Sequence, residues 1–530
     1  MDKTSRMGNL LTATESTETT PNSMTTWNGA LSYETMKDPL VELFFKSVRN
    51  INCTDYQCVK VKKSKKAKKS KKQCHDYNHM GGKTLENYFD AAWETDPART
   101  LKFLFYLRDC RGGKGERRLF RALVRHMRET ERGHHIETNM EHIPFFGSWK
   151  DVSMCFFGTS LEENAIKLIA GQLKDDLSSD HPSICAKYAP SEKGAIDRDH
   201  KAASKIATEL GVTLTGYRKK FLGPLRSKLN IVERNMCAKD WDTIKYETVP
   251  SIAGSNYKIA FRRHDESRYD EYLESVKKGE KKMNTSVLMP HQIVAPYLTK
   301  TLRDEDNTIE AQWKSFVDDR KAKWTFGVNV LPLIDVSSSM ETGDNPQPIE
   351  VSVSLGLLFS LLNSNCHYRG KFITFNTTPE FLSIPDGSLY EQVRYIKKSP
   401  WGGSTNFQAA FDLILNTATT FSIPKEQMPQ ILLVLSDMQF DRADDSTNWE
   451  KIESKYAAAG YERPTIIFWN LNGKSIDFPV PDASVPKCAL ISGYNDSILY
   501  SLIDGMIPNP SEIVTKILDA ERYDIIKLAE

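Results

Sequence analysis

Two aspartates lie directly after apolar runs late in the chain, where they are placed to hold a metal ion. The largely apolar residues 328–334 run into Asp335, and residues 431–435 run through Ser436 into Asp437. Such runs are typical of buried parallel strands, whose carboxyl ends open onto the ligand crevice of a doubly wound sheet. We therefore expect the two carboxylates to lie close together at one edge of an α/β sheet.

Hydroxyl groups complete the set. Ser337 and Ser339 follow Asp335 at two-residue steps, and Thr405 follows two glycines that let its loop approach closely. Carboxylate and hydroxyl oxygens suit Mg²⁺, and Mn²⁺ or Ca²⁺ remains open, whereas the lack of Cys and His argues against zinc here. Helix capping by these side chains is the alternative. The predicted metal ligands are Asp335, Ser337, Ser339, Thr405 and Asp437.

This arrangement resembles the metal-ion-dependent adhesion site of von Willebrand factor A domains over about residues 320–530. The resemblance implies that Ser337, Ser339 and Thr405 touch the metal and that the two aspartates hold it directly or through water. It also implies that an acidic group of a protein partner completes the coordination shell. The family often has Gly where this chain has Ser338, which leaves every ligand position intact.

Composition limits the class of protein. The chain has 530 residues, enough for two to four domains, with 40% hydrophobic and 26% charged residues and a net charge of +2. Nine scattered cysteines favour a reducing compartment, and we find neither a signal-peptide pattern nor a membrane-spanning stretch. We expect a cytoplasmic protein without a membrane partner, and an extracellular adhesion role is disfavoured.

The chain divides into three predicted regions. Residues 1–28 are a polar Ser/Thr-rich tail that we expect to be disordered. Residues 29–320 are expected to form an all-α, HEAT-like helical array with an insert at 52–82, and residues 321–530 an α/β doubly wound, Rossmann-like domain. Helices are expected near 40–45, 89–93, 101–107, 119–126, 161–177, 198–210, 216–229, 265–278 and 351–362. Strands are expected at 328–334, 372–375, 431–435 and 465–469.

The insert carries the most basic stretch of the chain, in which eight of eleven residues are lysine. Such a stretch favours binding to RNA, DNA or anionic lipid, or nuclear import, and a solvated loop without a partner is the alternative. The candidate nucleic-acid ligands are Lys62, Lys63, Lys65, Lys66, Lys68, Lys69, Lys71 and Lys72.

Cysteines and histidines flank the lysine run. Their spacing would allow a tetrahedral Zn²⁺ site that closes the base of the insert, although a free thiol is often only a buried apolar group. The candidate zinc ligands are Cys53, Cys58, Cys74, His75 and His79.

A glycine-rich basic turn follows the third expected helix. It lacks the spacing of a phosphate loop, and its glycines are typical of a capped helix end. Its cations could contact a nucleic-acid backbone or form salt bridges within the helical array. They are Arg108, Arg111, Lys114, Arg117 and Arg118.

Several motifs in order resemble a domain-of-unknown-function family of plants, fungi and giant DNA viruses. The lysine insert and its cysteines depart from that family. The order of helical array and von Willebrand A domain is also similar to the Ro ribonucleoprotein class, whose helical ring binds RNA; this likeness concerns fold order alone. The matching motifs are at 101–117, 146–151, 186–190, 288–291, 436–441 and 468–471.

We expect a non-enzymatic, Mg²⁺-dependent binding protein that captures an acidic residue of a protein partner, with RNA binding through the helical half as a further expectation. No catalytic triad or paired-carboxylate motif stands out. A structural or assembly scaffold without nucleic-acid function, including a virion component, remains the alternative, and a metal-dependent hydrolase is less favoured. The sequence does not determine the oligomeric state. Nuclear or virion localisation also stays open.

Overall fold

The protein is described by a computed structural model that covers residues 23–25, 31–51, 83–298, 302, 304–324, 327–342, 346–363, 365, 367–374, 379–398, 407–438, 449–474, 477–503 and 509–530. Its N-terminal half is rich in helices, and its C-terminal half contains a mixed sheet of six strands. The lysine run, the five candidate zinc ligands and Thr405 lie outside the described residues.

Helices dominate the first half, and every helix expected there is present. The expected helix at 198–210 is interrupted at Lys201, which adopts a φ of 53°. The expected helix at 265–278 is the second part of a longer helix that bends at Asp265. The helices are α1 (Pro39–Lys46), α2 (Leu85–Thr95), α3 (Pro97–Arg108), α4 (Arg117–Glu129), α5 (Gly133–Thr138), α6 (Ile143–Phe146), α7 (Trp149–Phe156), α8 (Glu162–Ser178), α9 (Cys185–Tyr188), α10 (Ala195–His200), α11 (Ala202–Glu209), α12 (Leu214–Gly216), α13 (Gly223–Lys228), α14 (Val232–Ala238), α15 (Ser251–Lys278), α16 (Pro290–Leu298) and α17 (Asn307–Lys323).

The predicted disordered tail needs one correction. Strand β1 (Ser23–Thr25) lies within it and pairs antiparallel with β2 (Leu31–Tyr33). A strand is stabilised by pairing with another strand, so the polar composition of this segment alone does not indicate that β1 forms. Residues 1–22 and 26–30 lie outside the described part of the chain.

The second half alternates strands and helices, as its apolar runs predict. The strands expected at 328–334, 372–375, 431–435 and 465–469 correspond to β3, β4, β6 and β7, whereas β5 and β8 were not expected. The elements are β3 (Val330–Ile334), α18 (Pro348–Leu362), β4 (Lys371–Thr374), β5 (Phe381–Ser383), α19 (Leu389–Lys398), α20 (Phe407–Thr420), β6 (Ile431–Ser436), α21 (Trp449–Ala458), β7 (Thr465–Asn470), β8 (Cys488–Ser492), α22 (Ser497–Ile503) and α23 (Pro510–Leu518).

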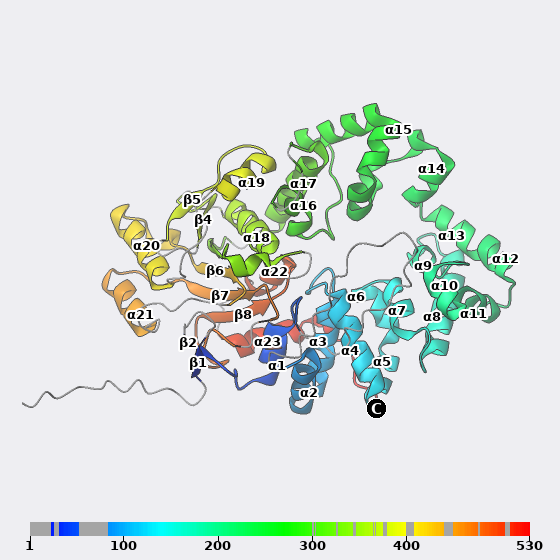
Figure 1. Cartoon of the computed structure of the whole chain (residues 1–530), viewed down its shortest axis with the longest axis horizontal. Coiled ribbons are helices and arrows are strands. Elements are labelled where there is room, and N and C mark those ends of the chain that lie inside the picture. The colour runs from blue at the N-terminus through cyan, green and yellow to red at the C-terminus, as the bar shows by residue number, and fades with distance from the viewer. Residues whose placement is uncertain are drawn as a thin grey trace, which may run out of the picture.

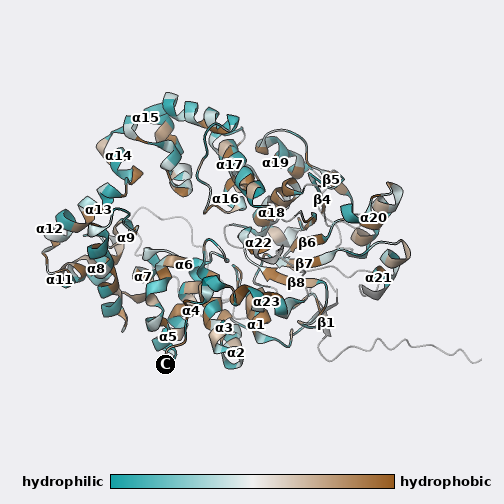
Figure 2. Cartoon of the chain, turned by 180° about the vertical axis from the view of Figure 1, so that it is seen from behind, coloured by the Kyte–Doolittle hydropathy of each residue, from teal (hydrophilic) through white to brown (hydrophobic). Residues whose placement is uncertain are grey.

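The sheet has the strand order β5-β4-β3-β6-β7-β8, with every pairing parallel except β4 with the edge strand β5. Counted within the sheet, this is the order 3-2-1-4-5-6 of doubly wound folds. Every residue of β3, β6 and β8 is buried, which shows that both faces of the sheet are covered. In Figure 2 strands β6, β7 and β8 are coloured mainly as hydrophobic and lie at the centre of the α/β half.

Helix α18 fixes the position of the central strand. It is buried along nearly its whole length and packs on β3, β4 and β6, as its all-round apolar character predicts. A Cβ on Gly356 would lie 2.8 Å from the Cδ1 atom of Ile334, the last residue of β3. The missing side chain therefore lets the helix lie close to the end of β3 that precedes Asp335.

The two halves are joined at both ends of the helical region. Helix α1 packs on β8 and α23, and α16 and α17 pack on α18, so the helices leave the sheet and return to it in an arc (Figure 1). Tyr33 and Phe478 exchange backbone hydrogen bonds of 3.0 and 2.9 Å. The C-terminal residues lie against α3 and α5, where Arg522 pairs with the buried Asp109.

Candidate functional site

The predicted metal ligands begin with two aspartates at the ends of adjacent central strands. Strands β3 and β6 pair in parallel, with Ile334 opposite Leu435, so Asp335 and Asp437 both lie just beyond the paired residues. After β3 the chain continues to β4 on one side of the sheet, and after β6 it continues to β7 on the other side. This is the topological switch point, where doubly wound sheets bind their ligands. Both aspartates are buried, with 2% and 3% of their surface exposed.

The Asp335 carboxylate has a defined orientation. The Ser337 backbone N–H donates to its Oδ1 atom at 2.9 Å, and the Ser436 hydroxyl donates to its Oδ2 atom at 2.6 Å. Each carboxylate oxygen has two lone pairs, so an oxygen that accepts a hydrogen bond can in general also bind a cation. The Ser337 and Ser339 hydroxyls lie 2.9 Å apart. The structure therefore brings three of the five predicted ligands into one hydrogen-bonded group.

The turn after Asp437 has an unusual backbone. Met438 adopts a φ of 66°, in the left-handed region that is costly for residues with a side chain, and its N–H donates to the Ser436 hydroxyl at 3.0 Å. The same hydroxyl contacts Asp335, so Ser436 ties the turn after β6 to the carboxylate after β3. Sequence reasoning did not assign Ser436 a role. Its place between an apolar strand and a candidate ligand was the available signal.

Several other predicted ligands lie in parts of the chain that the structure does not describe. Thr405 and the candidate zinc ligands Cys53, Cys58, Cys74, His75 and His79 lie outside the described residues, so they stay predictions. Within the described residues no three His, Cys, Asp or Glu side chains are grouped to hold a metal. A centre built from those ligand types alone is therefore absent from that part of the chain.

Two of the predicted nucleic-acid ligands are buried in the protein, and that prediction is wrong for them. Arg108 is 4% exposed and pairs with Asp151 at 2.7 Å, a carboxylate that also accepts from Arg121. Burial raises the pKa of Asp151, the two guanidinium groups lower it, and the net shift is downward. Arg108 therefore forms a salt bridge within the helical array, which was the alternative to contact with nucleic acid.

Lys114 is the second of these residues, and it is fully buried. Its ammonium group donates to the Ser47 carbonyl at 3.0 Å, to the Ser492 hydroxyl at 2.7 Å and to the Phe44 carbonyl. Burial lowers its pKa well below the usual value for lysine. Lys114 therefore joins helix α1 to strand β8, a contact over hundreds of residues that its local sequence does not reveal.

The buried residues of the basic turn contact both halves of the molecule. Glu116 pairs with Arg49 at 2.9 Å, and the Asn495 side chain donates to the Gly113 carbonyl at 2.8 Å. Sequence reasoning missed Asn495 because its partner is far away in the chain. Three other predicted cations remain exposed at this turn and on the first turn of α4: Arg111, Arg117 and Arg118.

The comparisons with known proteins identify regions of unknown function. Residues 329–524 match the model of a domain of unknown function, DUF7788, and residues 26–130 and 208–326 match that of another, DUF2828. An uncharacterized protein of Acanthamoeba polyphaga mimivirus is 28% identical over 542 residues, which cover 93% of this chain and 87% of the viral protein.

A solved structure gives a weaker likeness. The crystal structure of the Ro protein of Deinococcus radiodurans aligns with 83% of this chain and 90% of its own, at 12% identity and a TM-score of 0.31, which is too low to establish a common fold. Among the described residues, no helix is both long and apolar enough to span a membrane. The chain thus combines a region similar to the DUF2828 family with a region similar to the DUF7788 family, and it resembles a giant-virus protein over most of its length.

Proposed function

We propose that the chain is a binding protein whose α/β half holds a divalent cation at the carboxyl edge of the sheet and captures an acidic group of a protein partner there. The observation that supports this most directly is the pair of buried aspartates after β3 and β6, at the switch point of the sheet. Mg²⁺ is the proposed ion, with Mn²⁺ and Ca²⁺ as alternatives.

The donor set fits a hard cation. Asp335 and Asp437 supply carboxylate oxygens, and Ser337 and Ser339 supply hydroxyls that already contact each other. Thr405 is the proposed fifth ligand by sequence alone. Two carboxylates leave a bound divalent ion without excess negative charge around it, so an anionic group from a partner is electrostatically acceptable at the remaining position.

We assign no reaction to this site. The groups that contact the Asp335 carboxylate include the Ser337 N–H and the Ser436 hydroxyl, which are hydrogen-bond donors rather than bases. A hydrolase would need a group that activates water. Turnover of RNA or a phosphoester by the wild-type protein, lost in Asp335→Ala, would overturn this assignment.

Calorimetric titration of the metal-free protein with Mg²⁺ and Mn²⁺ tests the proposal. Asp335→Asn keeps the shape of the side chain and removes its charge, and we expect at least a tenfold loss of affinity. Asp386→Asn is the matched control, since Asp386 is an exposed carboxylate of the same half of the chain. Equal binding by wild type and Asp335→Asn would contradict the proposal.

RNA binding is a second candidate function, supported by the exposed cations Arg111, Arg117 and Arg118 and by the lysine run in the sequence. The salt dependence of RNA binding would be compared between wild type, a deletion of residues 62–72 and a variant with the three arginines changed to Gln. The matched control changes a distant exposed basic triplet to Gln, made up of Arg218, Lys219 and Lys220.

A specific interface predicts that the deletion or the first triple variant weakens binding and flattens the salt slope, while the control triplet matters little. Equal effects of both triplets would indicate non-specific attraction. Absence of RNA binding at low salt would remove this function and favour the scaffold alternative.

A further inference from the structure

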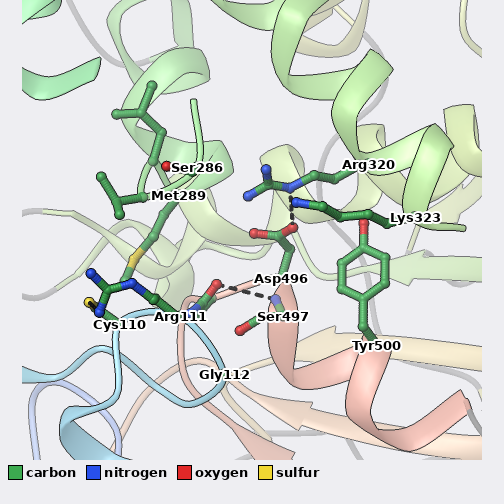
Figure 3. A pocket seen from close by; sticks show the side chains of 13 residues that line it. Cys110, Arg111, Gly112, Ser286, Met289, Arg320, Lys323, Asp496, Ser497 and Tyr500 are labelled. Atoms are coloured by element: carbon green, nitrogen blue, oxygen red, sulfur yellow. Dashed lines mark hydrogen bonds and ion pairs between the residues drawn. The ribbon is translucent and has the colours of Figure 1, made fainter. Parts of the chain in front are cut away.

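A cavity of about 280 Å³ lies between the helical half and the α/β half. Its walls come from four distant segments: the turn at 110–112, the loop at 286–289 before α16, the end of α17 at 320–323, and the turn at 495–500 that begins α22. Figure 3 shows the side chains of these segments around a common space. The cavity lies apart from the proposed metal ligands, none of which lines it.

A buried carboxylate faces this cavity. Asp496 is 1% exposed, and its Oδ2 atom accepts from the Arg320 Nε atom at 2.8 Å. Its Oδ1 atom has no hydrogen-bond partner among the described residues, and in Figure 3 one oxygen of this group points towards the side of Arg111 and Met289. The Tyr500 hydroxyl, which belongs to the same wall segment as Asp496, also lacks a hydrogen-bond partner among the described residues. We expect a ligand or a water molecule to form hydrogen bonds with buried polar atoms that lack a protein partner.

Positive charge surrounds the carboxylate. Arg111, Arg320 and Lys323 line the cavity, and Asp496 is the acidic residue among its lining side chains. Arg320 and Lys323 share Asp319, whereas Arg111 has no ion-pair partner among the described residues and donates to the Phe145 carbonyl at 3.0 Å. The rim therefore favours an anion near Arg111, and the buried carboxylate favours a hydrogen-bond donor deeper in the cavity.

The loop before α16 contributes an apolar wall, formed by Val287, Leu288 and Met289. The volume is near the lower end of the range for small-molecule sites, which limits the occupant to roughly the size of one nucleotide. Arg111 and Lys323 are exposed, so the cavity is open to solvent on their side.

We propose that this cavity binds a small phosphorylated ligand that carries sugar hydroxyls, with a nucleoside monophosphate as its representative. The phosphate lies against Arg111 and Lys323, and a hydroxyl donates to Asp496. The apolar wall receives the base or the carbon skeleton. Carboxylates commonly accept hydrogen bonds from ribose hydroxyls, and guanidinium groups match phosphate oxygens. The same chemistry is present in a free nucleotide and in the phosphorylated end of an RNA strand.

Calorimetric titration of the full-length protein tests this assignment. The probes are AMP, UMP, ribose 5-phosphate, adenosine and inorganic phosphate, together with a short RNA with or without a 5′-phosphate. We expect AMP, UMP or ribose 5-phosphate to bind more tightly than adenosine or inorganic phosphate. Binding by the phosphorylated RNA alone would also support the assignment and identify a strand end as the source. Failure of every phosphorylated probe to bind at millimolar concentration would overturn it and leave water as the occupant.

Variants locate the site. We expect Arg111→Gln to weaken binding at least about tenfold and Lys323→Met about threefold or more, since both remove a charged contact to phosphate. Lys321→Met is the matched control, because Lys321 is exposed on the same helix and does not line the cavity. Tyr500→Phe removes the hydroxyl alone and should weaken the sugar-bearing probes without affecting inorganic phosphate. Equal losses in Lys321→Met and Lys323→Met, or phosphate binding as tight as AMP binding, would overturn the assignment.

Discussion

Histidine 291 should make the protein less stable as the pH falls below neutral. It is 4% exposed at the start of α16, with its ring edge-on to Tyr494 at 5.7 Å and its Nδ1 atom without a hydrogen-bond partner among the described residues. Burial, reinforced by the positive charge of Arg49, lowers its pKa from 6.5 to about 3. The folded protein therefore holds this imidazole neutral at pH values where the unfolded chain takes up a proton.

The sign and the size follow from this difference in proton binding. Between pH 6.5 and 3 the unfolded chain binds more protons at this residue, so the free energy of unfolding decreases as the pH falls. The loss approaches about 1.4 kcal/mol per pH unit and reaches about 2 kcal/mol between pH 7 and pH 5.

Urea denaturation at a series of pH values would measure this effect. His291→Phe keeps a ring of similar size and cannot take up a proton, so its stability should decrease less between pH 7 and pH 5, by about 2 kcal/mol relative to wild type. His181→Gln is the matched control, because His181 is exposed to solvent in the folded chain. Identical pH dependence of wild type and His291→Phe would refute the reasoning.

Two further predictions concern the junction between the halves. A Cβ on Gly113 would lie 2.1 Å from the Tyr106 carbonyl oxygen, so Gly113→Ala should destabilise the protein by about 3 kcal/mol or more in urea denaturation. Gly171→Ala, in helix α8 with open space around it, should instead stabilise by about 0.5–1 kcal/mol; destabilisation by both would contradict the argument. Asp109→Asn removes the buried charge that holds Arg522, and we expect a loss of about 3 kcal/mol with faster hydrogen exchange in residues 519–530. Unchanged exchange there would mean that the C-terminal segment does not depend on this ion pair.

The central part of the sheet could be predicted from the sequence because burial on both faces leaves continuous apolar runs. Strands β3 and β6 follow this rule, and their order placed Asp335 and Asp437 at neighbouring strand ends. Strand β5 was missed because it is a short edge strand with partly exposed residues. Strand β8 was also missed, although its five residues are all buried in the folded protein.

Contacts between the two halves could not be predicted, since they depend on residues far apart in the chain. The sequence leaves open whether Arg108 and Lys114 contact nucleic acid or form salt bridges within the helical array, and only the folded arrangement shows their partners. The pairing of Asn495 with Gly113, and the cavity beside it, follow from the same arrangement. The candidate metal ligands could therefore be predicted from local sequence pattern, whereas the junction between the halves depends on tertiary packing.

Anomalous diffraction from crystals grown with Mn²⁺ tests the central claim most directly, because it locates the ion without assuming its ligands. We predict a peak at the carboxyl edge of the sheet, within coordination distance of oxygens from Asp335, Ser337 or Ser339, or one bound water away from them. We also predict that Asp335→Asn crystals lack this peak. A Mn²⁺ peak elsewhere with none at this edge, or an unchanged peak in Asp335→Asn, would contradict the account.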